Sequence, residues 1–258
     1  MIELGQEHLE TWARDRIVVL RGALDAYETR DLRRWTSELE AWPETPGRWM
    51  KYFEGEARTL CRVEDFLPWH DGLRGLLLRD DLMACLERLF GEPAVLFKEK
   101  INFKAPGGDG FAPHQDAPAF ASFGQDWHVT AMFAIDEATR SNGCLEFVRG
   151  HAERMAIAQE EDGTVARDVE AGLCWEPLEA EPGDVVLFDS YVPHRSGRNE
   201  SGTPRRAAFV TYNPASQGER RADYFARKRR AFPPECERDP NAPPDPDAAT
   251  FNLGNPIR

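Results

Sequence analysis

Two histidines and one aspartate have residue types and a spacing that could bind a metal ion. His114 and Asp116 are separated by one residue, so in an extended segment both side chains point to the same side. His194 comes much later, directly after the apolar run 185–188 and a turn. Two imidazoles and one carboxylate bind one face of Fe(II) and leave three adjacent positions open for substrate and oxygen. A His-x-Asp motif is common by itself, but together with His194 it predicts an iron site that activates oxygen.

Arginines downstream of His194 could hold an anionic cosubstrate beside that site. Arg205 and Arg206 open the run 207–212, which is typical of a strand. Adjacent strand residues point to opposite faces, so one guanidinium group faces inward while the other faces water. A guanidinium offers a planar fork that binds a carboxylate through two hydrogen bonds. We expect one of these arginines to bind an oxoacid, and the sequence leaves open which one.

The segment 95–104 alternates apolar and polar residues with the period of a strand. Glu99 alone interrupts its apolar set. The polar set, which should share one face, is Lys98, Lys100, Asn102 and Lys104. Such a face is either solvated or forms the polar wall of a pocket.

The first hundred residues are expected to be mainly helical. Asp25 could cap a helix that ends before Pro43, because apolar residues recur at helical spacing at Leu32, Trp35, Leu39 and Trp42. A second helical stretch is expected from Leu73 to Phe90, closed by Gly91. The segments 49–53 and 59–66 could be short strands or loops.

From residue 94 onward, short β-like runs alternate with turn residues. They span 95–104, 127–136, 144–148, 184–188 and 207–212. This pattern predicts an α+β fold with a mainly β core, a sandwich or barrel, buttressed by the N-terminal helices. We expect a single domain over 1–258, made of a helical buttress (1–93), a β core (94–214) and a C-terminal arm (215–258). Six prolines in 233–246 predict an extended arm that could cover the active site, make a dimer contact or do neither.

Composition limits the classes of partner. The chain has 32 basic and 45 acidic residues, a net charge of −13, which argues against binding to nucleic acid. A mean hydropathy of −0.58 and the lack of an 18-residue apolar run argue against a membrane span. The N-terminal residues lack the apolar core of a secretion signal, and five dispersed cysteines are typical of reduced thiols. The sequence therefore predicts a cytoplasmic protein with a small-molecule substrate, and it leaves the oligomeric state open.

Several motifs, in order, resemble the phytanoyl-CoA dioxygenase (PhyH) family. They include Pro113-His-Gln-Asp116, Asn142-Gly-Cys-Leu-Glu-Phe-Val-Arg-Gly-His151 and His194-Arg-Ser-Gly-Arg-Asn199, with further matches at 102–107, 134–139 and 181–188. The resemblance spans residues 94–214 and is weaker in the N-terminal helices. Members of this family are Fe(II)- and 2-oxoglutarate-dependent oxygenases with a double-stranded β-helix, a jelly roll similar to that of cupins.

The resemblance implies roles for individual residues. His114, Asp116 and His194 would be the iron ligands. The contacts to 2-oxoglutarate would come from Arg205, Ser196, Asn102 and Lys98. A carboxylate at 116 favours hydroxylation, since related halogenases lack it. The implied cofactors are Fe(II), 2-oxoglutarate and O2, with ascorbate as an activator in vitro.

The segments 97–102, 113–120 and 224–234 resemble those of bacterial members that hydroxylate small aminoalkylphosphonates. Cationic candidates for binding a phosphonate are Lys100, Lys104 and Arg198. Phe120 and Trp127 could instead surround a quaternary ammonium group or an apolar natural product, or could belong to the ordinary core. Three alternatives stay open: an oxygenase of natural-product biosynthesis, a cupin-like metal enzyme without redox chemistry, and a non-catalytic jelly-roll binding protein.

Overall fold

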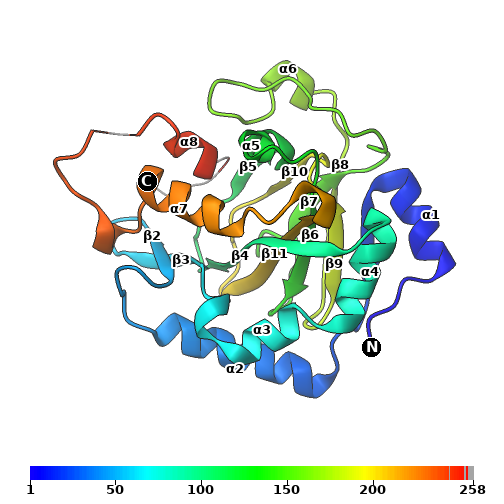
Figure 1. Cartoon of the computed structure of the whole chain (residues 1–258), viewed down its shortest axis with the longest axis horizontal. Coiled ribbons are helices and arrows are strands. Elements are labelled where there is room, and N and C mark those ends of the chain that lie inside the picture. The colour runs from blue at the N-terminus through cyan, green and yellow to red at the C-terminus, as the bar shows by residue number, and fades with distance from the viewer. Residues whose placement is uncertain (244, 253, 255–258) are drawn as a thin grey trace.

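The structure, a computed structural model, describes residues 1–243, 245–252 and 254. Its centre is a pair of antiparallel sheets (Figure 1). The larger sheet has the strand order β1 (Ile17–Leu20), β9 (Val185–Asp189), β6 (Val129–Ala134), β11 (Arg205–Pro214), β4 (Ala94–Lys104), β3 (Thr59–Glu64) and β2 (Met50–Glu54). The smaller sheet has the order β5 (Phe111–His114), β10 (His194–Ser196), β7 (Leu145–Val148) and β8 (Trp175–Leu178). This arrangement confirms the predicted α+β jelly roll.

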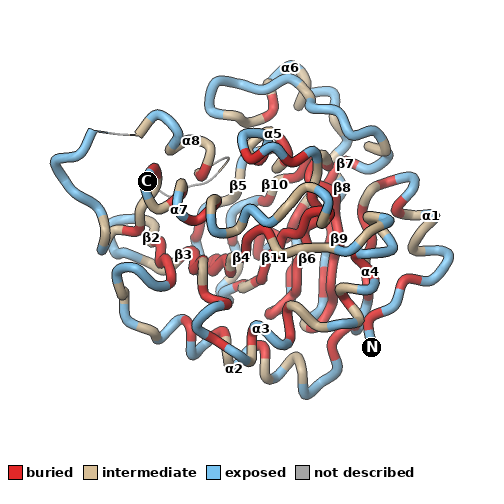
Figure 2. Tube along the Cα trace, viewed as in Figure 1, coloured by how far each residue is buried: buried red, intermediate tan, exposed pale blue. Residues whose placement is uncertain are grey.

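Among the described residues the core has three apolar clusters: one on each face of the large sheet, and a third that joins Phe97 of β4 to Tyr224 and Phe225 near the C-terminus. The cluster between the sheets includes Met132 and Phe209 from the large sheet and Phe147 from the small one. The cluster on the other face joins the large sheet to the helices, through residues such as Leu32 and Leu86. Figure 2 shows the buried residues concentrated along the strands and on the inner sides of the helices. The helices therefore buttress one sheet, as the sequence predicts.

Four helices cover the large sheet: α1 (Gln6–Asp15), α2 (Ala26–Ala41), α3 (Asp71–Leu77) and α4 (Asp80–Phe90). Asp25 caps α2 by accepting hydrogen bonds from the backbone N–H groups of Tyr27 and Glu28, which confirms the predicted start. The prediction of one helix over 73–90 is wrong, because Arg79 is extended and separates α3 from α4. Its guanidinium bonds Glu28 of α2 at 2.8 Å, a tertiary contact that local periodicity does not reveal.

The first 93 residues also supply three strands to the large sheet. The apolar segment β1 pairs with β9, and β3 pairs with β4. The alternative that 49–53 and 59–66 are loops is therefore wrong, since β2 and β3 form a hairpin there. Residues 1–93 thus contribute strands to the large sheet as well as the helices that cover it.

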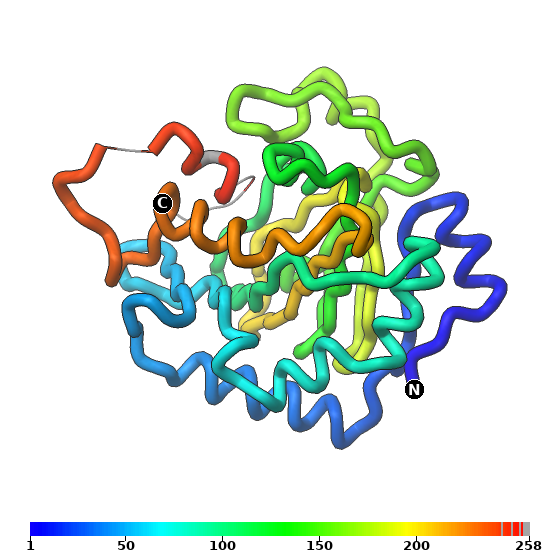
Figure 3. The backbone as a smooth tube through the Cα atoms, viewed as in Figure 1, coloured from blue at the N-terminus to red at the C-terminus, as the bar shows by residue number. Residues whose placement is uncertain are grey.

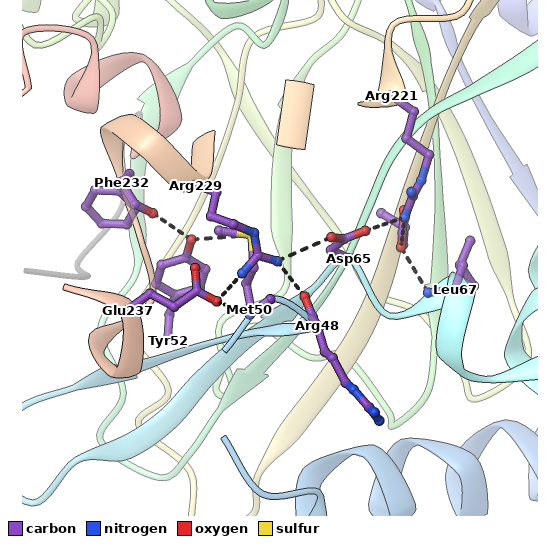
Figure 4. A network of polar contacts seen from close by, with 11 residues as sticks. Arg48, Met50, Tyr52, Asp65, Leu67, Arg221, Arg229, Phe232 and Glu237 are labelled. Atoms are coloured by element: carbon purple, nitrogen blue, oxygen red, sulfur yellow. Dashed lines mark hydrogen bonds and ion pairs between the residues drawn. The ribbon is translucent and has the colours of Figure 1, made fainter. Parts of the chain in front are cut away.

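The C-terminal arm begins with α7 (Arg221–Ala231), which packs on β4 (Figure 3). Two arginines of α7, Arg221 and Arg229, both donate to Asp65 just beyond β3 (Figure 4). The arm then returns through α8 (Ala248–Phe251) to β5, where the Ala112 N–H donates to the carbonyl of Gly254 at 2.8 Å. Residues 244, 253 and 255–258 of the predicted arm lie outside the described residues. The two remaining short helices are α5 (Ala117–Phe120) and α6 (Arg167–Glu170).

None of the helices formed by the described residues is long and apolar enough to cross a membrane.

Candidate active site

The structure brings the three predicted metal ligands together between the sheets. His114 ends β5 and His194 begins β10, and the two residues face each other in the antiparallel register. Their ring centroids lie 4.3 Å apart, and His114 Nε2 lies 4.0 Å from Asp116 Oδ1. One ligand atom from each of the three residues falls within 4.8 Å of the others. The donor set therefore fits a single metal ion bound on one face.

Backbone carbonyls orient both imidazoles. His114 Nδ1 donates to the Ala112 carbonyl at 2.8 Å, and His194 Nδ1 donates to the Val192 carbonyl at 3.0 Å. These hydrogen bonds leave the Nε2 lone pairs free for a metal ion. Metal-binding histidines usually donate their other ring N–H to a nearby acceptor in this way. Burial, reinforced by the neighbouring His194, lowers the pKa of His114 to about 3. Burial also lowers the pKa of His194, so both rings are neutral ligands at neutral pH.

Asp116 supplies the anionic ligand. Burial alone would raise its pKa, but the ammonium of Lys98 and the two imidazoles lower it well below its usual range. The carboxylate is therefore ionised at any physiological pH. Gln115, between the two ligands, is fully buried on the other side and binds the backbone of Ile157 and Met155, which anchors the ligand-bearing loop.

Arg205 lies at one end of the pocket, and no carboxylate among the described residues forms an ion pair with it. Its side chain is 2% exposed, and Nε and Nη1 have no hydrogen-bond partner in the described part of the chain. Burial lowers its pKa to about 10, so it stays protonated at neutral pH. Arg206 points to the opposite face and forms an ion pair with Asp136 at 2.8 Å. A buried guanidinium without an ion pair suits a bound anion, and of the two arginines it is Arg205 that lines the pocket.

Ser196 and Lys104 lie beside Arg205. Lys104 Nζ donates to Ser196 Oγ at 2.9 Å and to the Gly197 carbonyl at 2.5 Å. Gly143, which has a φ of +74°, allows this close packing, because a Cβ there would lie 2.3 Å from the Gly197 carbonyl oxygen and 2.9 Å from Lys104 Nζ. Lys104 was predicted to contact the substrate, but the structure places it at the Arg205 end of the pocket.

The predicted polar face of β4 is the wall of this pocket. Lys98, Lys100 and Asn102 line it together with the metal ligands, which confirms the pocket-wall interpretation of the alternation. Burial lowers the pKa of Lys98, and lowers that of Lys100 well below its usual range, with further repulsion from Arg62 and Lys98. Glu99, on the other face, is buried and bonded to Arg221 at 2.7 Å.

Four predicted substrate contacts do not line the pocket: Lys104, described above, and Arg198, Trp127 and Phe120. Arg198 lies on an exposed loop, with 62% of its side chain exposed, and donates to the Gly107 carbonyl. Trp127 packs against Phe90 and carries the guanidinium of Arg154 over its ring. Phe120 is one layer behind the wall, with its ring 4.2 Å from Lys98 Nζ. Arg198 and Trp127 lie elsewhere because loop packing and core packing determine where they point.

Several lining residues were missed by the sequence analysis: Phe111, Thr130, Leu145, Phe188, Phe209 and Thr211. Two of them could have been found, because Phe209 and Thr211 lie four and six residues after Arg205 and so share its face of β11. The others depend on pairing between strands that are distant in sequence.

A jelly roll that holds a His/Asp/His site beside an unpaired buried arginine defines the mononuclear iron oxygenases that use an oxoacid. This chain belongs to the phytanoyl-CoA dioxygenase (PhyH) family, whose model matches residues 12–207. It is an Fe(II)- and 2-oxoglutarate-dependent dioxygenase.

Two relatives align over most of the chain. The chain is 50% identical over 257 residues to 2-aminoethylphosphonate dioxygenase from uncultured bacterium HF130_AEPn_1, an alignment that covers 98% of each chain. It is 40% identical over 231 residues to methylphosphonate hydroxylase from Gimesia maris, covering 89% of this chain and 88% of that protein.

Solved structures share the fold. EctD from S. alaskensis with 2-oxoglutarate and 5-hydroxyectoine superposes with a TM-score of 0.71 at 20% identity, covering 83% of this chain and 77% of that one. The epimerase SnoN in complex with Fe3+, alpha-ketoglutarate and nogalamycin RO gives a TM-score of 0.69 at 21% identity, covering 98% and 95%.

Proposed function

We propose that this enzyme hydroxylates a small organophosphonate at the carbon next to phosphorus. One observation carries the proposal: Lys98, which is buried, and Lys100, which is half-buried, line the pocket with the metal ligands and have no ion pair or hydrogen bond within the described residues. Burial lowers the pKa of both amines, and an oxyanion of high charge bound between them would favour their ammonium forms and accept hydrogen bonds from them. The names of the two close relatives, which act on 2-aminoethylphosphonate and methylphosphonate, support the same substrate class.

A charge balance leads to the same substrate. The ionisable residues lining the pocket are three basic side chains, Lys98, Lys100 and Arg205, and one carboxylate, Asp116. Bound Fe(II), Asp116 and Arg205 together carry two positive charges, which the two carboxylates of 2-oxoglutarate neutralise. The two lysines then remain for the substrate. A phosphonate carries up to two negative charges and matches them, whereas a carboxylate or a sulfonate carries one.

The residues at the Arg205 end are proposed to bind the oxoacid. Arg205 would hold the distal carboxylate through two hydrogen bonds, with Ser196 as a hydroxyl donor. Lys104 lies outside the pocket lining but donates to Ser196 Oγ, so it would hold that hydroxyl in place. Asn102 lies between this end and the middle of β4, where it would contact the oxoacid closer to the metal. Lys98, which the resemblance linked to the oxoacid, is about 20 Å along the strand from Lys104 and is proposed to serve the substrate.

Three of the chain's own residues would hold the metal: His114, Asp116 and His194. When bound, Fe(II) with 2-oxoglutarate and O2 supplies the oxidising power that turns a C–H bond into C–OH, while the oxoacid becomes succinate and carbon dioxide. The lysines would orient the phosphonate so that its neighbouring carbon faces the metal ligands. The apolar side chains of Phe188 and Phe209 exclude water from that space.

Membership of an oxygenase family favours this activity over a cupin-like metal enzyme without redox chemistry and over a binding protein. The unpaired Arg205 supports the same choice, because neither alternative requires an anion at that end of the pocket. A natural-product substrate is the second candidate, but the wall beside the metal is cationic rather than apolar.

All five cysteines are free thiols. Their reduced state supports the proposed location in the cytoplasm, a reducing compartment.

Substrate isosteres provide the test. Succinate formation with Fe(II) and ascorbate should be coupled to 2-aminoethylphosphonate or methylphosphonate, and should stay at the substrate-free rate with taurine or β-alanine. Lys100→Met should raise KM for the phosphonate about tenfold or more, through loss of a charge-assisted contact, and leave KM for 2-oxoglutarate unchanged. Lys51→Met is the matched control, because Lys51 is a buried lysine that donates to the carbonyls of Glu40 and Trp42 away from the pocket. Coupled turnover with taurine would contradict the proposal. A lack of coupled turnover with both phosphonates would also contradict it.

A further inference from the structure

A row of buried charged side chains lies beside the pocket wall, on the same face of the large sheet, and ends at Asn102. Lys228 of α7 donates to Glu64 at 2.6 Å, and Arg62 Nη1 donates to the same carboxylate at 3.2 Å. Arg62 Nε then donates to Asn102 Oδ1 at 3.2 Å. All four side chains are buried, and Arg62 and Asn102 are register partners on β3 and β4. The row therefore connects α7 to the face of β4 that lines the active site.

This contact determines which way the Asn102 carboxamide faces. A guanidinium has five N–H donors and no acceptor, so Asn102 must turn its oxygen toward Arg62. The amide nitrogen then faces the pocket, which Asn102 lines. Within the described residues, Asn102 Nδ2 has no hydrogen-bond partner. An N–H donor directed at that point suits a carboxylate oxygen.

Arg62 is itself held on two sides. Burial alone would raise the pKa of Glu64, but Lys228 and Arg62 lower it to about 2, so Glu64 is a permanent anion. The guanidinium also lies 5.7 Å from the ring centre of Phe111, another residue that lines the pocket. With these partners, Arg62 cannot turn away from Asn102 without leaving the buried Glu64 short of a donor.

We propose that Arg62 is a positioning residue for the cosubstrate. It holds Asn102 with its amide nitrogen toward the pocket, where that nitrogen donates to a carboxylate oxygen of 2-oxoglutarate. This proposal rests on the proposed placement of the oxoacid between the metal ligands and Arg205. Without Arg62 the carboxamide is free to turn over, and its oxygen would then face the carboxylate and repel it.

A double-mutant cycle on 2-oxoglutarate binding tests the inference without turnover. The dissociation constant is measured by calorimetry on protein loaded with Ni(II), for the wild type, Arg62→Met, Asn102→Leu and the double variant. Loss of one charge-assisted hydrogen bond should weaken binding about tenfold in Asn102→Leu, and Arg62→Met should lose a similar factor. Because Arg62 acts through Asn102, the double variant should bind no more weakly than Asn102→Leu.

Arg221→Met is the matched control. Arg221 bonds the buried Glu99 on the opposite face of the same strand, so its loss should lower the unfolding temperature without changing 2-oxoglutarate affinity. If Arg62→Met does not fold, Arg62→Lys keeps a charge beside Glu64 but loses the fork, and should show an intermediate loss of affinity. Further weakening of Asn102→Leu by the second substitution, or unchanged affinity in either single variant, would overturn the proposal. Failure of the phosphonate assignment would appear instead in the isostere panel, with these affinities unaffected.

Discussion

The backbone N–H of Ala112 donates to the carbonyl of Gly254, which joins the C-terminal arm to the strand that carries His114. The arm lies so close that a Cβ at Gly254 would be 3.0 Å from His114 Nδ1. Phe251, in the same arm, is buried against Tyr224 with the ring centroids 5.5 Å apart. The arm thus lies against the strand that carries His114, and we predict that it covers the edge of the metal site, one of the roles the sequence leaves open.

Loosening the arm should uncouple the reaction. Phe251→Ala removes the aromatic anchor, so water should reach the site more easily and succinate should form in excess over hydroxylated product. The measurement is the ratio of succinate to product under saturating substrate. Tyr27→Ala is the control, because Tyr27 is an aromatic residue that is 70% exposed on α2. A ratio that stays at the wild-type value in Phe251→Ala would show that the arm does not seal the site.

Arg205 and Arg206 should respond oppositely to substitution. Arg205→Met should raise KM for 2-oxoglutarate about 100-fold, since a bidentate ionic contact contributes roughly 3 kcal/mol. The same variant should stabilise the cofactor-free protein, because it removes a buried unpaired cation. Each kcal/mol gained in the free energy of unfolding should raise the unfolding temperature by roughly 2–4 °C. Arg206→Met, which loses the ion pair with Asp136, should leave KM unchanged. A raised KM in Arg206→Met, with an unchanged KM in Arg205→Met, would show instead that Arg206 binds the oxoacid.

The affinity for 2-oxoglutarate should depend on pH through Lys104. Burial, aided by repulsion from Arg205, lowers the pKa of Lys104 to about 7. A bound dianion favours the ammonium and raises that pKa, so the free protein must take up a proton to bind. Affinity is therefore full below pH 7 and should fall by up to about tenfold per pH unit above it. Calorimetry in buffers of different ionisation enthalpy measures the proton uptake. Lys104→Met should remove both effects, and persistent uptake in that variant would assign the proton to another group.

The metal ligands should be essential for turnover but not for folding. His114→Ala and Asp116→Ala should each lower turnover by more than about 100-fold. Substitution of residues that only support a metal ligand already costs up to about that factor. Their far-ultraviolet circular dichroism should match the wild type, because these side chains line a pocket rather than fill the apolar core. Bound iron, measured by elemental analysis, should fall in parallel with activity. Full turnover in either variant would contradict the metal assignment.

Local patterns predicted much of this molecule. The capping Asp25, the alternation along β4 and the His/Asp/His spacing are short-range signals, and the structure bears out each one. The sequence also predicts that Arg205 and Arg206 point to opposite faces of one strand, and they do so in the structure.

Features that depend on distant contacts were not predicted. The break between α3 and α4 depends on Arg79 reaching α2. The contact between Arg62 and Asn102 requires β3 to pair with β4, and a sequence in which 59–66 could be strand or loop does not specify that register. Trp127 has the residue type for a substrate pocket, but it packs against Phe90 and Arg154 instead.

Phosphorus-31 NMR of a reaction with 2-aminoethylphosphonate, Fe(II), 2-oxoglutarate and O2 tests the central claim most directly. We expect one new phosphonate resonance whose intensity grows in step with succinate, with the hydroxyl on the carbon next to phosphorus shown by its coupling to that carbon's proton. Succinate that accumulates while the phosphonate resonance stays unchanged would contradict the claim that Lys98 and Lys100 bind a phosphonate for hydroxylation.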